Sequence, residues 1–240
     1  MSQLPLAGRV AAVTGGSGGI GSAIIEHLTA AGAIAYSLDV AKAGAGNGWI
    51  DTDVRDDASM SAAMAEIDRR HGRVDLLVHA AGISHDAVLW KMPLYEWDRI
   101  MAVNLRGAFL LLRHGIPALR RAAGGRAVLI GSINGSRGKL GTGAYSASKA
   151  GLIGLARTAA RETGRFGIRV NVIEPGWVRT PLTDALPRDV VDAAVSESLM
   201  GKLLEPADVA RAVTFLCGPG GEAITGQVLR VDGGQYLGGW

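Results

Sequence analysis

The sequence has little of what would tie the protein to an oxidising compartment, a membrane or a metal ion. Its 240 residues include a single cysteine, Cys217, which excludes an internal disulfide and a cysteine-ligated metal centre, and no metal site is predicted. No apolar run approaches the roughly 18 residues that a membrane-spanning helix needs. The first ten residues lead directly into an apolar strand pattern, with no room for a cleavable leader. We therefore expect a cytoplasmic protein without a membrane partner.

Aromatic residues and net charge are also scarce. Aromatics make up 5% of the chain and the formal net charge is only +3. The basic residues are scattered rather than gathered into a stripe that alternates with aromatics, as a nucleic-acid surface would require. We therefore expect no nucleic-acid partner.

What the chain does have is an alternation of apolar runs and longer amphipathic segments. Because the runs are almost continuously apolar, they are typical of strands covered on both faces, as in a parallel sheet. The segments between them have helical spacing and stop on glycine. No repeat or change in composition marks a boundary, so we predict one doubly wound α/β domain over residues 1–240. The expected strands are 9–15, 33–39, 74–82, 126–132, 168–176 and 227–234, and the expected helices are 21–32, 56–72, 95–125 and 144–164.

The stretch VTGGSGGIG lies between the first expected strand and the first expected helix. In that setting backbone N–H groups and a helix N-terminus converge on a pyrophosphate, and side chains would obstruct it. Asp39 ends the next strand, 20 residues after Gly19, where a carboxylate would accept from the ribose hydroxyls and repel a 2′-phosphate. The pattern predicts a dinucleotide site that favours NAD over NADP, although the nearby Lys42 offsets part of that preference.

A second constellation follows in the middle of the chain. Tyr145 and Lys149 are four residues apart on one helix face, and Ser132 ends the strand before them. Hydride exchange between a nicotinamide and a carbonyl carbon needs a proton at the oxygen. A tyrosine working near pH 7 needs its pKa lowered by roughly 3 units, which the Lys149 ammonium and a positive nicotinamide ring would supply. The Ser132 hydroxyl would hold the substrate oxygen.

With these motifs the chain resembles the short-chain dehydrogenase/reductase family over its whole length, and within it the 3-oxoacyl and acetoacetyl-CoA reductases. TGGSGGIG, HAAG, VNL, GSING, YSASK, NVIEPGWVRT and TGQVLRVDGG carry the resemblance. It implies a Rossmann fold with a mainly parallel seven-stranded sheet in the order 3-2-1-4-5-6-7. It also implies that Asn104 orders a water that relays protons through Lys149. The implied cofactor contacts are Gly15, Ser17, Gly18, Gly19, Ile20, Gly21, Asp39, Asp53, Val54, Ala80, Ala81, Gly82, Tyr145, Lys149, Pro175, Gly176, Val178 and Thr180.

Two departures from the family pattern bear on activity and substrate. Where the family usually has N-N-A-G this chain has His79-Ala80-Ala81-Gly82, and we interpret His79 as a core residue rather than a catalytic base. The carrier-protein reductases have arginines at positions that match Ala123 and Phe166 here. A substrate on a carrier protein is thereby disfavoured, whereas CoA thioesters and free ketones stay open.

The sequence thus predicts an NAD(H)-dependent oxidoreductase that interconverts a secondary alcohol and a ketone, with a 3-oxoacyl/3-hydroxyacyl thioester as one substrate class. A free cyclic or aryl alcohol is the alternative, and an NAD-binding redox sensor without turnover is a remote one. The long apolar helices predict a homotetramer, or at least a dimer. The predicted substrate contacts are Asn134, Trp177, Leu182 and Leu186, with His85 and Trp90 at the mouth.

Overall fold

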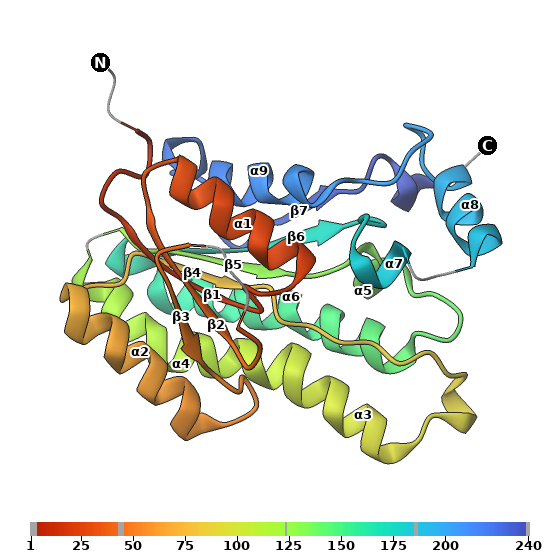
Figure 1. Ribbon diagram of the computed structural model, residues 1–240, viewed down its shortest axis with the longest axis horizontal. Coiled ribbons are helices and arrows are strands. Elements are labelled where there is room, and N and C mark those ends of the chain that lie inside the picture. The colour runs from red at the N-terminus through yellow and green to blue at the C-terminus, as the bar shows by residue number, and fades with distance from the viewer. Residues whose placement is uncertain (1–3, 43–45, 123, 185–186, 239–240) are drawn as a thin grey trace.

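One seven-stranded sheet organises the computed structural model, which describes residues 4–42, 46–122, 124–184 and 187–238 (Figure 1). All of its strand pairs are parallel, in the order β3-β2-β1-β4-β5-β6-β7. The expected fold class and strand order are confirmed. The strands are β1 (Val10–Thr14), β2 (Ile34–Asp39), β3 (Gly48–Asp51), β4 (Leu76–His79), β5 (Arg126–Ile130), β6 (Arg169–Pro175) and β7 (Val228–Val231).

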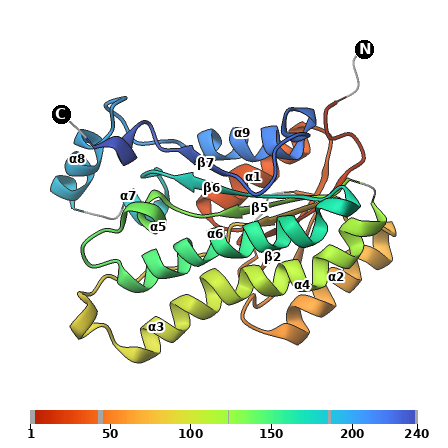
Figure 2. The same cartoon turned by 180° about the vertical axis from the view of Figure 1, so that it is seen from behind.

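Helices cover both faces of this sheet because side chains alternate along each strand. Val10 and Ala12 of β1 pack into the core under one helical layer, and Ala11 and Val13 pack into the core under the other. The first layer holds α2 (Asp57–His71), α4 (Gly107–Arg121) and α6 (Gly143–Thr163), and the second holds α1 (Gly19–Ala30) and α9 (Pro206–Cys217) (Figures 1 and 2).

Local chemistry fixes where the helices begin and end. The Asp56 side chain accepts a hydrogen bond from the Ser59 N–H and so caps the first turn of α2. The same helix stops at Gly72, whose φ of 67° is one that glycine adopts without strain. The glycine stop that the sequence predicted at this position is confirmed.

The helix expected over residues 95–125 is interrupted. The structure has α3 (Leu94–Met101), a π-helical segment η2 (Ala102–Arg106) and then α4. A π turn adds one residue to a helix without ending it. The helical pattern continues before and after it, so the sequence predicted one long helix. This segment carries Asn104.

Several short elements were not predicted from the sequence pattern. The strand β3 is an edge strand, partly buried or exposed throughout, so it lacks the continuous apolar run of its neighbours. The short helices are α5 (Ile133–Arg137), α7 (Pro181–Asp184) and α8 (Arg188–Ser196), and the 3₁₀ turns are η1 (Leu89–Lys91), η3 (Gly164–Phe166), η4 (Pro219–Gly221) and η5 (Gln235–Leu237).

Cys217, at the end of α9, is completely buried, and burial raises the pKa of its thiol to about 12. In the described part of the chain no helix has the length and apolarity to cross a bilayer. The described residues also contain no group of three His, Cys, Asp or Glu side chains placed to hold a metal ion.

Candidate active site

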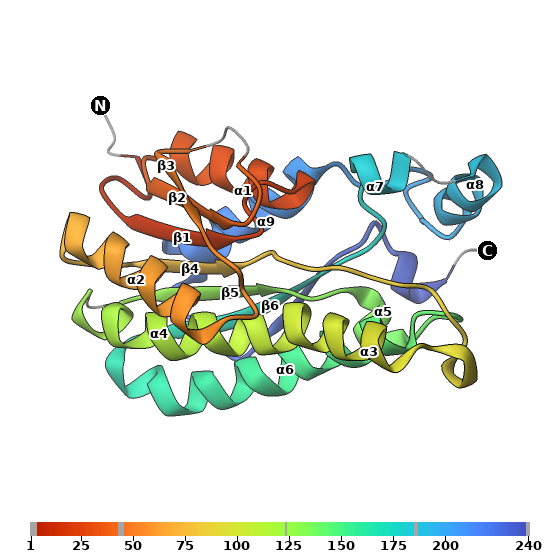
Figure 3. The same ribbon diagram turned by 60° about the horizontal axis from the view of Figure 1, so that its bottom comes forward.

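The predicted site residues meet along one edge of the sheet. Because all seven strands are parallel, their carboxyl ends lie side by side, and this is where open α/β sheets bind ligands (Figure 3). The segments that leave these ends carry the glycine loop, Asp39, residues 80–82, Ser132 and residues 176–180. The strand-end residues are Thr14, Asp39, His79, Ile130 and Pro175.

The glycines of the first loop are present for different physical reasons. A Cβ on Gly15, whose φ is +67°, would stand 2.5 Å from the Ala81 nitrogen, and one on Gly21 would stand 2.0 Å from the Gly15 oxygen. Gly18 is open, since a Cβ there would meet nothing nearer than 3.4 Å. Gly15 and Gly21 are therefore needed by the fold, whereas Gly18 leaves the N-terminus of α1 free for a phosphate.

The loop also meets the last of the site segments. A Cβ on Gly19 would lie 3.1 Å from Thr180 Cγ2. Ile20 packs against the core beneath α1. The glycine loop and residues 176–180 therefore form two adjoining walls, as a dinucleotide lying across this edge would need.

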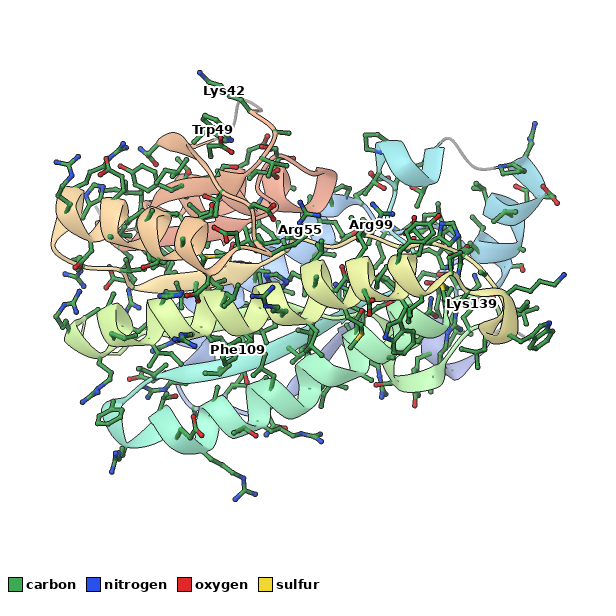
Figure 4. All side chains as sticks on the ribbon, turned by 90° about the horizontal axis from the view of Figure 1, so that it is seen from below. Lys42, Trp49, Arg55, Arg99, Phe109 and Lys139 are labelled. Carbon is green, nitrogen blue, oxygen red and sulfur yellow. The ribbon has the colours of Figure 1, made fainter. Side chains whose placement is uncertain are left out.

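The Asp39 carboxylate is held rigidly beside the loop. One oxygen accepts from the Ser17 N–H at 3.1 Å and the other from the Ala41 N–H at 3.1 Å. Each oxygen keeps a lone pair for a ribose hydroxyl. Lys42 lies over the ring of Trp49 at 5.8 Å, and the Trp49 indole N–H donates to the Asp39 carbonyl at 2.9 Å (Figure 4). A positive charge thus lies on the same loop as the ribose-binding candidate.

Asp53 and Val54 follow β3, where the resemblance implied adenine contacts. The Asp53 carboxylate is bonded to Arg55, which lowers its pKa. Val54 is buried and lies 3.1 Å from where a Cβ on Gly107 would stand. The Asp53 side chain therefore already has a cationic partner that sequence reasoning did not identify.

The segment after β4 runs over Lys149. The Ala80 N–H donates to the Thr14 carbonyl at 3.1 Å, and Ala81 is buried. A Cβ on Gly82 would lie 3.2 Å from the Lys149 Nζ, so a side chain at this position would crowd the ammonium.

Ser132, Tyr145 and Lys149 meet at the carboxyl end of β5. Ser132 caps α5 by accepting from the Asn134 N–H at 3.2 Å, and its hydroxyl lies close enough to the Tyr145 phenol to lower the pKa of that group. Lys149 is buried, its Nζ donates to the Ile130 carbonyl at 2.7 Å, and it lies 5.6 Å from the Tyr145 ring centroid. The three side chains that were predicted to act together thus meet, because one strand end and one helix position them.

Without a bound cofactor, the pKa of Tyr145 is shifted in the direction opposite to the one that proton transfer near pH 7 needs. Burial raises the pKa of the phenol and outweighs the bond from Ser132, which lowers it. Lys149 does not compensate, because its ammonium bonds a carbonyl rather than the phenol, and burial lowers its own pKa to about 8.

Asn104 is buried in the π segment and its side-chain amide has three partners. Its Nδ2 donates to the Ile83 carbonyl at 2.9 Å and to Ser148 Oγ at 3.0 Å, and its Oδ1 accepts from the Ile83 N–H at 2.9 Å. The amide thus fixes the segment after β4 against α6. Sequence reasoning missed Ser148, a small residue of YSASK with no distinguishing signal.

His79 is completely buried beneath this site. Its Nε2 lies 3.2 Å from the Asn104 carbonyl, which can only accept, so Nε2 carries the proton and Nδ1 accepts from the Thr14 hydroxyl at 2.8 Å. Burial, reinforced by the Lys149 charge, lowers its pKa to about 3. The ring is therefore a neutral support for the π segment.

The wall after β6 is held by the C-terminal segment. The Trp177 N–H donates at 2.7 Å to the side chain of Gln235, which is buried and which sequence reasoning missed. Val178 is buried and pairs with Leu204, and the Thr180 N–H donates to Thr183 Oγ1 at 2.7 Å.

The predicted substrate contacts are only partly brought together. Asn134 and Trp177 are both half-buried, and the Lys139 ammonium lies 4.3 Å from the Trp177 ring centroid. Trp90, predicted to lie at the mouth, is 82% exposed. Leu186 and Ala123 lie outside the described residues, as does the side chain of Leu182. The guanidinium groups of Arg120 and Arg165 lie 4.0 and 4.7 Å from the centroid of the Phe166 ring.

Comparison with known proteins gives full-length relatives. A family model described as enoyl-(acyl carrier protein) reductase matches residues 15–235. The chain is 38% identical over 239 residues to the 3-oxoacyl-(acyl-carrier-protein) reductase of Escherichia coli (strain K12), covering 96% of this chain and 98% of that protein. It is 35% identical over 243 residues to the acetoacetyl-CoA reductase of an Acinetobacter species, covering 95% and 98%. The solved ligand-free aldohexose dehydrogenase of Thermoplasma acidophilum matches with a TM-score of 0.92 at 30% identity, covering 98% of this chain and 97% of that one.

Proposed function

We propose that this chain, which belongs to the short-chain dehydrogenase/reductase family, is an NAD(H)-dependent oxidoreductase that interconverts a ketone and a secondary alcohol, with 3-oxoacyl thioesters as its substrate class. The observation that carries the proposal is the meeting of Ser132, Tyr145 and Lys149 beside the glycine loop. A protein that only sensed the nucleotide would have no chemical need for this set.

Each side chain has a role in the proposed reaction. The Ser132 hydroxyl donates to the substrate oxygen, and the Tyr145 phenol gives that oxygen a proton in reduction or takes one in oxidation. Lys149 lies beneath the phenol and would hold the nicotinamide ribose. When bound, the nicotinamide supplies or accepts the hydride, and its oxidised ring adds the positive charge that lowers the pKa of Tyr145. Asn104 fixes the floor of the site and, in the proposal, orders the water that connects Lys149 to solvent.

The preference for NAD rests on Asp39. Its carboxylate is fixed by two backbone N–H groups at the end of β2, so it cannot swing away from a 2′-phosphate. Lys42, on the same loop, reduces the repulsion without removing it, because its ammonium lies over Trp49. We expect a preference for NADH rather than exclusive use of it.

Two kinds of relative bear on the substrate. The two reductases named for acyl-carrier-protein and CoA thioesters support a 3-oxoacyl thioester. The aldohexose dehydrogenase, similar in fold over the whole chain, favours the alternative of a free cyclic alcohol. The half-buried Asn134 and Trp177 are compatible with both.

The oligomer belongs to the proposal as well. A mainly apolar hollow of about 600 Å³ lies over α3, η2, α4 and α6. It is lined by Met101, Ala102, Leu105, Phe109, Gly151 and Leu155, with Asp98 and Arg106. Figure 4 labels Phe109. Exposed apolar surface of this kind favours association, so we propose that this face joins copies of the chain into a dimer or tetramer.

The unpaired, buried Cys217 needs no oxidising compartment and is compatible with a cytoplasmic location.

The test is turnover resolved by cofactor and substrate. NADH or NADPH is paired with acetoacetyl-CoA and with cyclic and aryl ketones, and the corresponding alcohols are offered with NAD⁺. NADH-dependent reduction of the thioester supports the full proposal. Activity on free ketones alone would keep the mechanism and discard the thioester, and NADPH preference would overturn the reading of Asp39.

A single substitution tests the mechanism. We expect Tyr145→Phe to lower kcat by at least about 10³-fold, because no other phenol replaces the proton donor, with NADH affinity unchanged. Turnover close to that of the unsubstituted protein would remove Tyr145 from the reaction. Tight NAD⁺ binding without turnover on any substrate by the unsubstituted protein would favour the sensor.

A further inference from the structure

We infer that Arg137 is a positioning residue, which fixes α8 against the substrate-facing side of α5 and so sets the affinity for substrate rather than the rate of hydride transfer. The inference rests on the proposed function, because it takes Asn134 and Trp177 to face the substrate. Arg137 is the last residue of α5, five residues after Ser132. Its partners come from three separate parts of the chain.

All three guanidinium nitrogens of Arg137 have an acceptor. Nη2 donates to Glu197 at 2.8 Å, Nη1 donates to the Gln235 carbonyl at 3.0 Å and Nε donates to Asn134 Oδ1 at 3.1 Å. Glu197 directly follows α8, Gln235 begins η5, and Asn134 is a predicted substrate contact. The planar guanidinium therefore joins α5, α8 and the C-terminal segment through donors held in a fixed fork, whereas the three donors of a lysine all radiate from one nitrogen. In Figures 1 and 2 these three elements lie at the same end of the molecule.

The side chain of Gln235 makes the opposite half of the same support. Its Nε2 donates to the Ala194 carbonyl within α8 at 2.7 Å, and its Oε1 accepts from the Trp177 N–H at 2.7 Å. A Cβ on Gly176 would stand 2.2 Å from that oxygen, so the glycine is required for the contact. Arg137 bonds Glu197 directly after α8, Gln235 bonds the Ala194 carbonyl in its last turn, and both connect the helix to residues expected to touch substrate.

The chain supplies an internal comparison on the same helix. In the Arg137–Glu197 pair the side chains are 21% and 37% exposed and 2.8 Å apart. In the Arg188–Asp192 pair of α8 they are 95% and 71% exposed and 3.9 Å apart. Exposed pairs of the second kind contribute little, because solvent screens the charges and ordering both side chains costs entropy. Arg188 is therefore a matched control that removes the same charge from the same region.

The test compares Arg137→Gln, Glu197→Gln, the double variant and the control Arg188→Gln. We expect Arg137→Gln to raise KM about tenfold with kcat within about twofold, because an unanchored α8 must be ordered each time substrate binds. Glu197→Gln should have a smaller effect in the same direction. The double variant should cost no more than Arg137→Gln alone, because the two residues act as one unit. Arg188→Gln should match the unsubstituted protein.

Hydrogen exchange of the α8 amides gives a readout that does not need turnover. We expect exchange to be about tenfold faster in Arg137→Gln and unchanged in Arg188→Gln. An unchanged KM, a fall in kcat at constant KM, or equal exchange in both variants would each overturn the inference. If the unsubstituted protein turns over none of the substrates, the proposed function fails, and hydrogen exchange alone decides whether Arg137 positions α8.

Discussion

At the scale of single residues, the site contains an ammonium that the fold does not favour. Lys149 is only 4% exposed, and burial lowers its pKa from 10.5 to about 8. Below pH 8 the lysine is charged in both the folded and unfolded states, and the folded state bears the cost of burying that charge. As the pH rises from 8 to 10.5 the folded protein releases the proton first, so the cost disappears and stability rises. Activity and stability thus make opposite demands on this position.

We predict that Lys149→Met abolishes turnover and makes the protein more stable at pH 7. The buried charge costs about 3 kcal/mol, and loss of the bond to the Ile130 carbonyl returns about 1 kcal/mol of that, which leaves a gain of about 2 kcal/mol. Urea unfolding at pH 7 and pH 10 measures the effect, and the gain should vanish at the higher pH. A variant less stable than the unsubstituted protein at pH 7 would show that Lys149 supports the fold.

The residues that sequence reasoning found and missed differ in how far their partners lie along the chain. Ser132, Tyr145 and Lys149 lie within 18 residues, on one strand end and the next long helix, so their meeting follows from local structure. The bond between Thr14 and His79 spans 65 residues and that between Trp177 and Gln235 spans 58. No spacing pattern reveals such pairs, because they depend on how the strands and the C-terminal segment pack.

At the scale of elements, the turn from β1 to α1 separates what the fold requires from what a ligand requires. Gly21 packs against the backbone of Gly15, whereas Gly18 has an ordinary φ of −80° and room for a Cβ, which would stand 3.4 Å from the Gly15 oxygen. Any residue could adopt the backbone of Gly18. The absence of a side chain there therefore needs an explanation outside the folded chain, and a bound pyrophosphate provides one.

The matched pair Gly18→Ala and Gly21→Ala tests this separation. We predict that Gly21→Ala lowers the free energy of unfolding by about 2–4 kcal/mol, because its methyl group would overlap the Gly15 oxygen. Gly18→Ala should change stability by no more than about 0.5 kcal/mol and weaken NADH binding about tenfold. Urea unfolding and calorimetric titration measure the two effects. Unchanged NADH affinity in Gly18→Ala would mean that the phosphates do not lie there.

Elements were predictable where burial left a periodic signal. The six strands read from the sequence are all present: five are largely buried, and the edge strand β7 is only partly buried but has three apolar residues in four. The edge strand β3 and the π segment at Asn104 were not predicted, because β3 has only two apolar residues in four and the π segment is a single turn inside one long helical pattern. The short α5 and α8 also depend on bonds between distant residues, from Arg137 to Glu197 and from Gln235 to the Ala194 carbonyl, which no local pattern reveals.

At the scale of the whole molecule, the face over α4 and α6 determines the proposed assembly. Phe109 of α4 is 44% exposed beside the apolar hollow, and Phe215 of α9, on the opposite layer, is 49% exposed. The two phenylalanines match in size and exposure and differ in the surface around them. They therefore distinguish the proposed face from surface apolarity in general.

We predict that Phe109→Glu converts the oligomer into smaller species and that Phe215→Glu does not. A carboxylate buried at the proposed face would cost several kcal/mol without a partner, whereas the same change on α9 stays in solvent. Sedimentation velocity of both variants and the unsubstituted protein measures the outcome. Dissociation by Phe215→Glu alone would place the interface on the other layer, and a monomeric unsubstituted protein would end the proposal.

The single buried thiol, Cys217, allows local unfolding around α9 to be measured by the rate of its alkylation. Only a thiolate attacks an alkylating reagent, and Cys217 is both shielded from solvent and held protonated by a pKa of about 12. Alkylation must therefore wait until α9 leaves the sheet, and with one thiol in the chain every modified molecule records one such event. The rate of alkylation can be measured with and without NADH. The ratio of the two rates would show how much cofactor binding at the carboxyl edge of the sheet reduces the opening of the α9 layer.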